Sequence, residues 1–239
     1  MNVMNSTIRR LLPCALVVLA ACAPIGPQLT QYQVGRARLV LPPGTWQDLD
    51  VSDETVAVLP APIGSIALQS HAVALRGAQQ EPLAVLRVQT NRDNYPRDTV
   101  YWTRACPRQP GVLVEDATND SPVRVDCLRI KSWAGSSQWL EKNQPDLMQW
   151  LEKHKLALDK PYSYLSYRYA ATGGAVVVVD AVVDQRLLRP PVRNNQEFLF
   201  AGRPTLQWSH ELRQAVRVST GMMNGYLAIP PFPLTAPVP

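Results

Sequence analysis

Charged side chains are scarce in this chain. Asp, Glu, Lys and Arg make up 18% of the 239 residues, and apart from Arg9-Arg10 no two lysines or arginines are adjacent. The formal net charge of +5 falls by two, to +3, if that pair is removed with the leader described below. Nucleic-acid binding normally requires a basic patch or stripe. The composition therefore disfavours a nucleic-acid partner and indicates an ordinary solvated surface.

Imidazole groups are equally rare, since His71, His154 and His210 are the only histidines. None belongs to a G-x-S-x-G nucleophile elbow or an H-E-x-x-H zinc motif. Each also lies in a strand-like or helix-like pattern that explains it structurally. The sequence thus predicts a protein that is not an enzyme and has no metal or cofactor. A hydrolase is the alternative, and it requires a histidine within hydrogen-bond reach of a serine, cysteine or carboxylate in a cleft.

Long hydrophobic runs are absent as well. Residues 11–19 form a short apolar stretch preceded by Arg9 and Arg10, whereas a membrane-spanning helix needs about 20 apolar residues. A basic start, a short apolar core and small residues after it are typical of a secretory signal peptide. A transmembrane anchor and twin-arginine export are the alternatives, but Ile8 before the arginine pair and Leu11-Leu12 after it fit the second poorly.

The end of this leader carries a resemblance to a known pattern. Leu19-Ala20-Ala21-Cys22 resembles the lipobox of bacterial lipoproteins. The resemblance implies that residues 1–21 are removed and that Cys22 carries a diacylglyceryl group and an acylated amine, which gives enough acyl chains for stable anchoring. Ala23 is not the acidic residue that often follows cysteine in lipoproteins kept at the inner membrane. The expected location is therefore the outer membrane, facing the periplasm.

Four cysteines occur, and two of them belong to the leader region. Cys14 would leave with the signal peptide and Cys22 would be lipidated, so Cys106 and Cys127 remain in an oxidising compartment. A metal site would need more ligands near the pair, and a redox pair would be closer in sequence. We therefore predict a disulfide between Cys106 and Cys127.

The chain contains 22 prolines, and this high content favours many short elements over a helical bundle. β-prone stretches alternate with turn residues, and the strongest helical periodicity follows Pro145, a proline tolerated in a first helical turn. A second helix is expected around Leu212, with Thr205 or Ser209 as its cap. The predicted fold is α+β, an antiparallel sheet with two main helices, and an α/β/α sandwich is its more specific form. The expected strands cover residues 36–41, 55–59, 65–75, 83–90, 99–105, 111–115, 122–133, 162–170 and 175–183.

The last two strands should form a hairpin through Thr172-Gly173-Gly174, and residues 176–179, apolar on both faces, should lie centrally in the sheet. Strand alternation in the hairpin places Tyr162 and Tyr164 on one face and Tyr167 and Tyr169 on the other. One of these sets is predicted to be exposed as a contact surface. Asp180 and Asp184 interrupt the same apolar strand; they mark either a site on a concave face or the emergence of the strand into solvent.

The chain is expected to comprise the signal peptide, a flexible tether at 22–33, one α+β domain at 34–229 and a proline-rich tail at 230–239. The tail favours an extended backbone, which is either disordered or recognised by a partner. The Pro-Gly-aromatic turn within residues 41–46, the Gly-Gly hairpin and the last helix faintly resemble the Mog1/PsbP-like domains. That resemblance implies an α/β/α sandwich and no catalytic residues.

Together these features predict a non-enzymatic lipoprotein of the cell envelope that binds or supports another envelope component, preferably a protein. The runner-up is a periplasmic module that binds glycan or lipid, and a concave pocket lined by aromatic residues would favour it.

Overall fold

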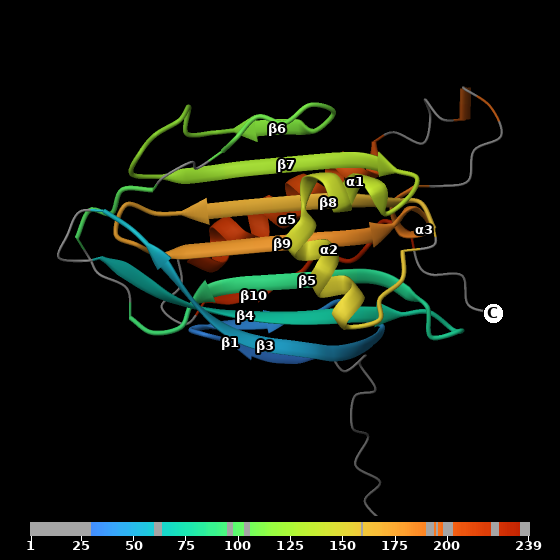
Figure 1. The fold of residues 1–239 in the computed structure, drawn as a ribbon, viewed down its shortest axis with the longest axis horizontal. Helices are drawn as coiled ribbons and strands as arrows, with labels where there is room; N and C mark the ends of the chain where they lie inside the picture. Colours follow the sequence, from blue (N-terminus) through green and yellow to red (C-terminus); the bar gives the residue numbers. More distant parts are fainter. Residues whose placement is uncertain are drawn as a thin grey trace, which may run out of the picture.

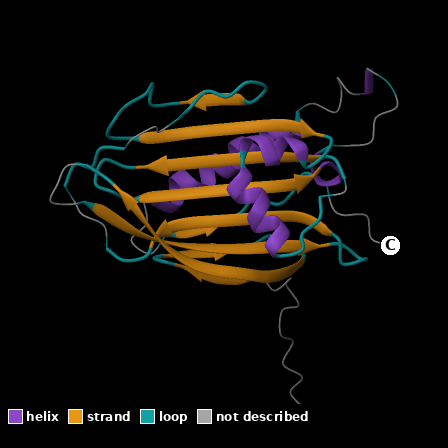
Figure 2. Ribbon diagram, in the orientation of Figure 1, coloured by secondary structure: helices purple, strands orange, loops and turns teal. Residues whose placement is uncertain are grey.

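The computed structural model describes residues 30–59, 64–94, 98–102, 106–158, 160–189, 194, 196–197, 203–220 and 225–234. The leader, Cys22 and the last five residues of the tail lie outside these ranges, so the predictions on them stay predictions. Within them the chain forms a seven-stranded sheet, a three-stranded sheet and helices on both faces of the larger one, as Figures 1 and 2 show. The α+β class is confirmed.

The main sheet is antiparallel throughout, in the order β3-β4-β5-β9-β8-β7-β6. Its strands are β3 (Thr45–Ala57), β4 (Ser65–Arg76), β5 (Pro82–Asn91), β6 (Leu113–Asp116), β7 (Val125–Ala134), β8 (Tyr162–Ala170) and β9 (Val176–Asp184). The apolar residues 176–179 are buried and β9 is the middle strand, as predicted. The β8–β9 hairpin is also confirmed: Ala171 N donates to Ala175 O across 2.8 Å, and Gly174 takes a positive φ of 90°, which glycine adopts without strain.

Three predictions about strands need correction. Residues 55–59 were expected as a short strand, yet β3 begins ten residues earlier, at Thr45. The stretch 99–105 contributes, among its described residues, only an isolated bridge from Tyr101 to Leu59. The change of phase from Val123 and Val125 to Leu128 and Ile130 predicts a bulge near Cys127, but the irregularity in β7 lies between Lys131 and Ala134. Both faces of β7 around the cysteine are buried, so apolar residues of either phase occur there without a bulge.

A second, smaller sheet joins the two ends of the described chain. β2 (Ala37–Val40) pairs antiparallel with β1 (Gln31–Val34) and parallel with β10 (Tyr226–Ala228). The predicted tether at 22–33 therefore ends too late, since Gln31 already belongs to β1. Val34 and the neighbouring strands bury apolar side chains against the main sheet, and this burial orders residues that look like a linker in sequence.

The face of the main sheet that carries this small sheet also carries α5 (Pro204–Thr220); it is called the back face below. Trp208, Leu212 and Val216 recur at helical spacing and are fully buried in the largest core cluster. Phe232 packs on the same cluster, stacked on Trp208 at 5.0 Å between ring centroids. Its neighbour Ile229 is buried as well, so the described start of the predicted tail is part of the domain.

The opposite face, called the front face below, is covered at one end by α1 (Gln138–Asn143) and α2 (Pro145–Lys153), which lie before the sheet in Figure 1. Pro145 occupies the first turn of α2, as predicted. The helical spacing of Leu147, Leu151 and Leu158 predicts a longer helix, but α2 ends at Lys153, because Lys155 has a positive φ of 56° that stops helical propagation. At the other end of this face the predicted disulfide joins Cys106 to Cys127 on β7, with sulfurs 2.02 Å apart.

Candidate functional site

A band of polar side chains crosses the front face between these two covered ends. On the helix side an apolar cluster includes Val85, Tyr164 and Val182, and on the disulfide side another includes Val125 and Val178. Between them, polar residues lie on the same face of the sheet, and the register pairs most of them: Arg87 with Asp180, Ser166 with both Asp180 and Arg129, and Ser70 with Gln89. We call them the central polar band: Glu54, Ser70, Arg87, Gln89, Arg129, Ser166, Arg168 and Asp180.

Asp180 is the acidic centre of this band. It accepts hydrogen bonds from Arg87 Nη2 at 3.4 Å and from the hydroxyl of Tyr164 at 3.3 Å. Burial, reinforced by the charge of Asp180, raises the pKa of Tyr164, so the phenol stays a donor at neutral pH. The idea that Asp180 marks the emergence of β9 into solvent is wrong: its side chain is only 13% exposed. Asp184, by contrast, stands at the strand end, where its carboxylate accepts from Arg186 N and caps α3 (Gln185–Leu188).

Two further groups complete the band. Gln89 Nε2 donates to Glu54 Oε2 at 2.9 Å and to Ser70 Oγ at 3.0 Å, and this joins β5 to β3 and β4. Arg129 on β7 donates from Nη2 to the side-chain oxygen of Gln109, whose amide in turn donates to Asn143 on α1 at 2.7 Å. The bonds from Arg129 through Gln109 to Asn143 therefore connect the band to the segment after Cys106 and to α1.

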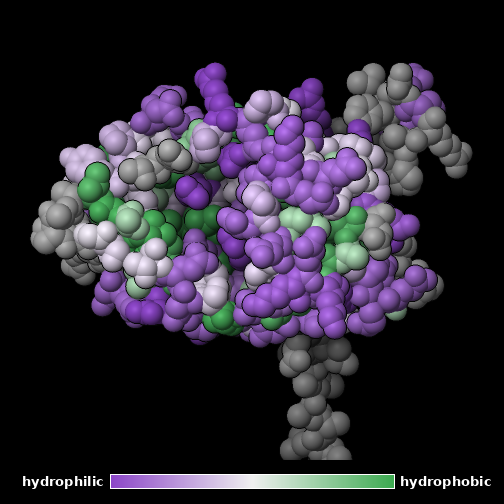
Figure 3. All heavy atoms as spheres, viewed as in Figure 1, coloured by the Kyte–Doolittle hydropathy of each residue, from purple (hydrophilic) through white to green (hydrophobic). Residues whose placement is uncertain are grey.

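Beside the band lies a cavity of about 90 Å³. Val125, Val176 and Val178 line it with apolar surface, and Arg168 and Gln89 add polar groups. In the space-filling view of this face, hydrophobic and hydrophilic atoms meet in a hollow beside the helical region (Figure 3). The full lining is Val56, Ala57, Leu68, Gln89, Trp102, Val125, Arg168, Val176 and Val178, and we call this the front recess.

Within the described structure, several N–H donors in this part of the molecule have no acceptor. Arg87 Nε, Arg129 Nε and Trp102 Nε1 are buried N–H groups with no hydrogen-bond partner among the described residues. The guanidinium of Arg168 is exposed and likewise forms no hydrogen bond or ion pair within the described part of the chain. Buried polar groups in folded proteins are nearly always paired. A concentration of unpaired N–H donors beside an apolar cavity therefore marks the front recess as the candidate binding site.

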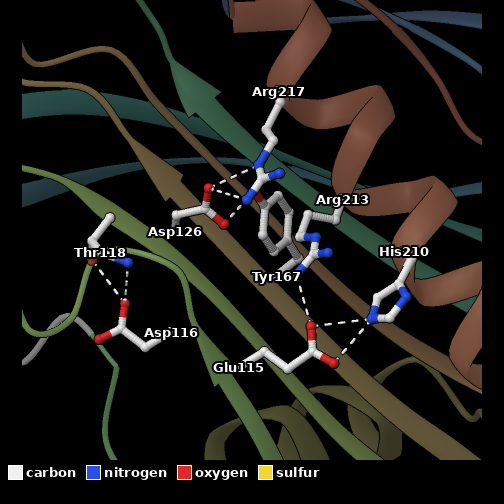
Figure 4. Close-up of polar contacts among 8 residues, drawn as sticks. All are labelled: Glu115, Asp116, Thr118, Asp126, Tyr167, His210, Arg213 and Arg217. Carbon is white, nitrogen blue, oxygen red and sulfur yellow. Dashed lines mark hydrogen bonds and ion pairs between the residues drawn. The ribbon is translucent and has the colours of Figure 1, made fainter.

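The back face has a second polar cluster, drawn in Figure 4, with the opposite character. Arg217 Nε on α5 donates to Asp126 on β7 at 2.7 Å, and the Tyr167 hydroxyl donates to the same carboxylate at 3.0 Å. Here all three groups are paired. A charge-assisted hydrogen bond between a helix and a sheet positions the helix, so this cluster docks α5 against the strand.

One turn or more earlier on α5, His210 and Arg213 contact Glu115 on β6, at 2.9 Å and 2.7 Å respectively. Figure 4 shows both side chains pointing from the helix toward that carboxylate. In the same view Asp116 turns away from the helix and accepts from Thr118 N at 2.9 Å within its own turn. The cluster therefore extends the docking of α5 to the edge strand.

The other two histidines also contact acids. His71 is buried, with Nε2 2.9 Å from Asp48 Oδ1, and His154 packs on Trp150 with Nε2 3.8 Å from Asp50. His71 and His210 therefore have the carboxylate partner within hydrogen-bond reach that the hydrolase alternative requires. Within the described residues, however, no serine or cysteine side chain forms a hydrogen bond with any of the three imidazoles, and no group of three or more His, Cys, Asp or Glu side chains could hold a metal.

The predicted tyrosine surface is wrong. The division between faces holds, since Tyr162 and Tyr164 join the cluster under α1 and α2, whereas Tyr167 joins the α5 cluster and Tyr169 packs against it. Tyr162, Tyr164 and Tyr167 are each at most 2% exposed and Tyr169 is half-buried. Both faces of the sheet are covered at these positions, so neither set forms an exposed row.

The three arginines of the central polar band were not predicted from the sequence as site residues, although each interrupts an apolar or aromatic strand. Arg87 stands within Leu86–Val88, and Arg129 between Leu128 and Ile130. The same signal singled out Asp180. Charged residues inside apolar strands, taken together, would have indicated a polar band on one face of the sheet.

No protein-family model, curated protein or solved structure matches this chain. No helix among the described residues is both long and apolar enough to cross a membrane.

Proposed function

We propose that this chain is a lipid-anchored protein of the bacterial cell envelope, not an enzyme, which binds another envelope component through the front recess. The observation that carries the proposal is the pairing of two features. The leader ends in Leu19-Ala20-Ala21-Cys22, and the two cysteines left in the mature chain are joined as Cys106–Cys127. Disulfides persist in oxidising compartments such as the periplasm, so both features fit an exported protein.

The arrangement of the domain suits attachment through Cys22. β1 begins at Gln31 and lies with α5 on the back face of the main sheet. Seven residues lie between Cys22 and Thr30, so the eight steps from one Cα to the other span at most about 28 Å when fully extended. A lipid at Cys22 would hold the domain within this distance of a bilayer, and it would leave the front recess on the opposite face free to bind.

The chemistry of the recess favours binding over catalysis. Its lining offers aliphatic surface, the unpaired indole N–H of Trp102 and the guanidinium of Arg168, and none of its lining residues is a histidine or an acid. A glycan-binding surface would offer several aromatic rings for stacking. Trp102 is the one aromatic residue in the lining, so the recess suits a ligand with a polar end and an aliphatic part better than it suits a sugar.

The anchoring is tested by replacing Cys22 with serine in a Gram-negative host. Cells expressing the parent chain, Cys22→Ser or Cys14→Ser are labelled with radioactive palmitate and separated into soluble and membrane fractions. The proposal predicts that the parent and Cys14→Ser are labelled and sediment with outer membranes, because Cys14 is removed with the leader. Cys22→Ser should be unlabelled and should keep its leader. Equal labelling of all three chains would refute the lipid anchor.

A further inference from the structure

We infer that the front recess binds a small organic anion: a carboxylate or phosphate group held by Arg168 and Arg129, with a short aliphatic part inserted among Val125, Val176 and Val178. This inference rests on the proposed binding role of the recess and names the chemical class of its ligand. The two arginines belong together by register. Arg168 lies opposite Cys127, and Arg129 is two residues further along β7 on the same face, a diagonal neighbour at about 7 to 8 Å.

The acidic side chains near the recess already have hydrogen-bond partners, and this determines the expected charge of the ligand. Glu54 accepts from Gln89 and Ser70, and Asp180 accepts from Arg87 and Tyr164. Asp116, on the far side of Cys127 from Arg168, accepts from its own turn.

No carboxylate in the described structure therefore pairs with Arg168, and Arg129 is held only by the neutral Gln109. The other nearby cation, Lys131, lies 5.9 Å from the centre of the Trp139 ring. The unpaired N–H donors therefore lie in a positively charged region, which favours an anionic ligand. Guanidinium groups bind carboxylate and phosphate oxygens with matched geometry.

The size of the aliphatic part follows from the cavity. Its volume of about 90 Å³ is smaller than the roughly 150 Å³ of a protein cavity that holds benzene. Val125 and Val176 are almost wholly buried, and the recess between them leaves room for a chain of a few carbons only. Trp102 borders the same space and offers its buried indole N–H as one more donor.

Isothermal titration calorimetry on the full-length protein in a non-ionic detergent tests the inference with four small probes: acetate, butyrate, n-propyl phosphate and the uncharged butyramide. Butyrate or propyl phosphate should bind, and whichever binds more tightly identifies the ligand's source as a carboxylate or a phosphate ester. Butyramide should bind at least tenfold more weakly than butyrate. Acetate should also bind about tenfold or more weakly, since each methylene removed from an apolar site costs about fourfold in affinity.

Arg168→Gln is the decisive variant: the side chain is exposed and has no hydrogen bond or ion pair with a described residue, so its loss should leave the fold intact. It should weaken binding of the tighter anion at least tenfold, whereas Arg38→Gln, an exposed strand arginine on the small sheet, should change it less than twofold. Equal binding of butyrate and butyramide, no anion binding, or unchanged affinity in Arg168→Gln would overturn the inference. If palmitate labelling of Cys22 succeeds while these titrations fail, the anchoring stands and the anion site alone is wrong.

Discussion

Arg87 on β5 and Asp180 on β9 occupy opposed positions in the strand register, and the guanidinium donates to the carboxylate across 3.4 Å. The pair is separated by 93 residues in sequence and joins the two halves of the main sheet. Its side chains are 30% and 13% exposed, so the ion pair is partly shielded from water and retains more of its strength than a surface pair.

Removing the acid of this pair should destabilise the domain. Asp180→Ala leaves both Arg87 and the Tyr164 hydroxyl without an acceptor, and the free energy of unfolding should fall by about 2 to 4 kcal/mol. Asp180→Asn keeps one acceptor oxygen and should cost less. Urea unfolding followed by circular dichroism measures both, with Glu152→Gln on the exposed face of α2 as the control. If the free energy of unfolding of Asp180→Ala falls by less than about 0.5 kcal/mol, the Arg87–Asp180 pair contributes little to stability.

The disulfide should contribute strongly to stability because it closes a loop between residues 21 apart in sequence. The chain-entropy relation gives roughly 3 kcal/mol for a loop of this size. Reduction should therefore lower the thermal midpoint of the parent protein and should have no effect on a Cys106→Ala/Cys127→Ala variant. Alkylation of the non-reduced native protein checks the bond itself, since neither thiol should react.

Alkaline pH should unfold the domain through its buried tyrosines. Burial, aided by the charge of Glu141, raises the pKa of Tyr162 to about 12, and burial raises the pKa of Tyr164 and Tyr167 as well. The folded state thus holds these protons more tightly than the unfolded chain, in which tyrosine titrates near 10.

By linkage, the stability from the neutral phenols is complete below about pH 10 and is lost as pH rises toward 12 and above. Absorbance at 295 nm and circular dichroism should accordingly change together over that interval. Ionisation of all eight tyrosines near pH 10, with the fold retained, would contradict the burial of these three rings.

The start of the proline-rich tail should matter to stability. Phe232 stacks on Trp208 at 5.0 Å and lies 6.5 Å from Trp46, with interplanar angles of 23° and 25°. Phe232→Ala removes these contacts and should reduce the free energy of unfolding by about 2 kcal/mol. Phe232→Leu keeps part of the apolar volume and should lose about half as much. Chemical denaturation of the three proteins gives the comparison, and an unchanged midpoint in Phe232→Ala would mean that the tail is detached in solution.

Sequence periodicity located the elements whose burial pattern is simple. The stretch 162–170 was predicted to the residue because apolar and aromatic side chains alternate between two clear turns. β3 was mostly missed because this edge strand carries polar side chains on both faces, with Asp48, Asp53 and Glu54 among them, and such a pattern resembles a loop.

The candidate site could not be predicted in the same way. Its residues come from β3, β4, β5, β7, β8 and β9, and only strand order and register bring Arg87 opposite Asp180 or Arg168 opposite Cys127. The two ends of the domain extend further than predicted, because proline and short polar stretches favour an extended backbone in a prediction from sequence. The pairing of β1 and β10 with β2 and the packing of Phe232 then fix that backbone on the domain.

The most direct test of the front recess as the working surface is site-specific photocrosslinking in intact cells. A photoreactive benzoylphenylalanine is placed at Ala57, an exposed residue that lines the recess, or at Gln207, an exposed residue on α5 of the back face. Irradiation should give a discrete adduct from position 57, detected as a mass increase of the intact protein, greatly weakened when Arg168→Gln is added, and none from position 207. An adduct from position 207 alone, or one from position 57 that is indifferent to Arg168, would contradict the account.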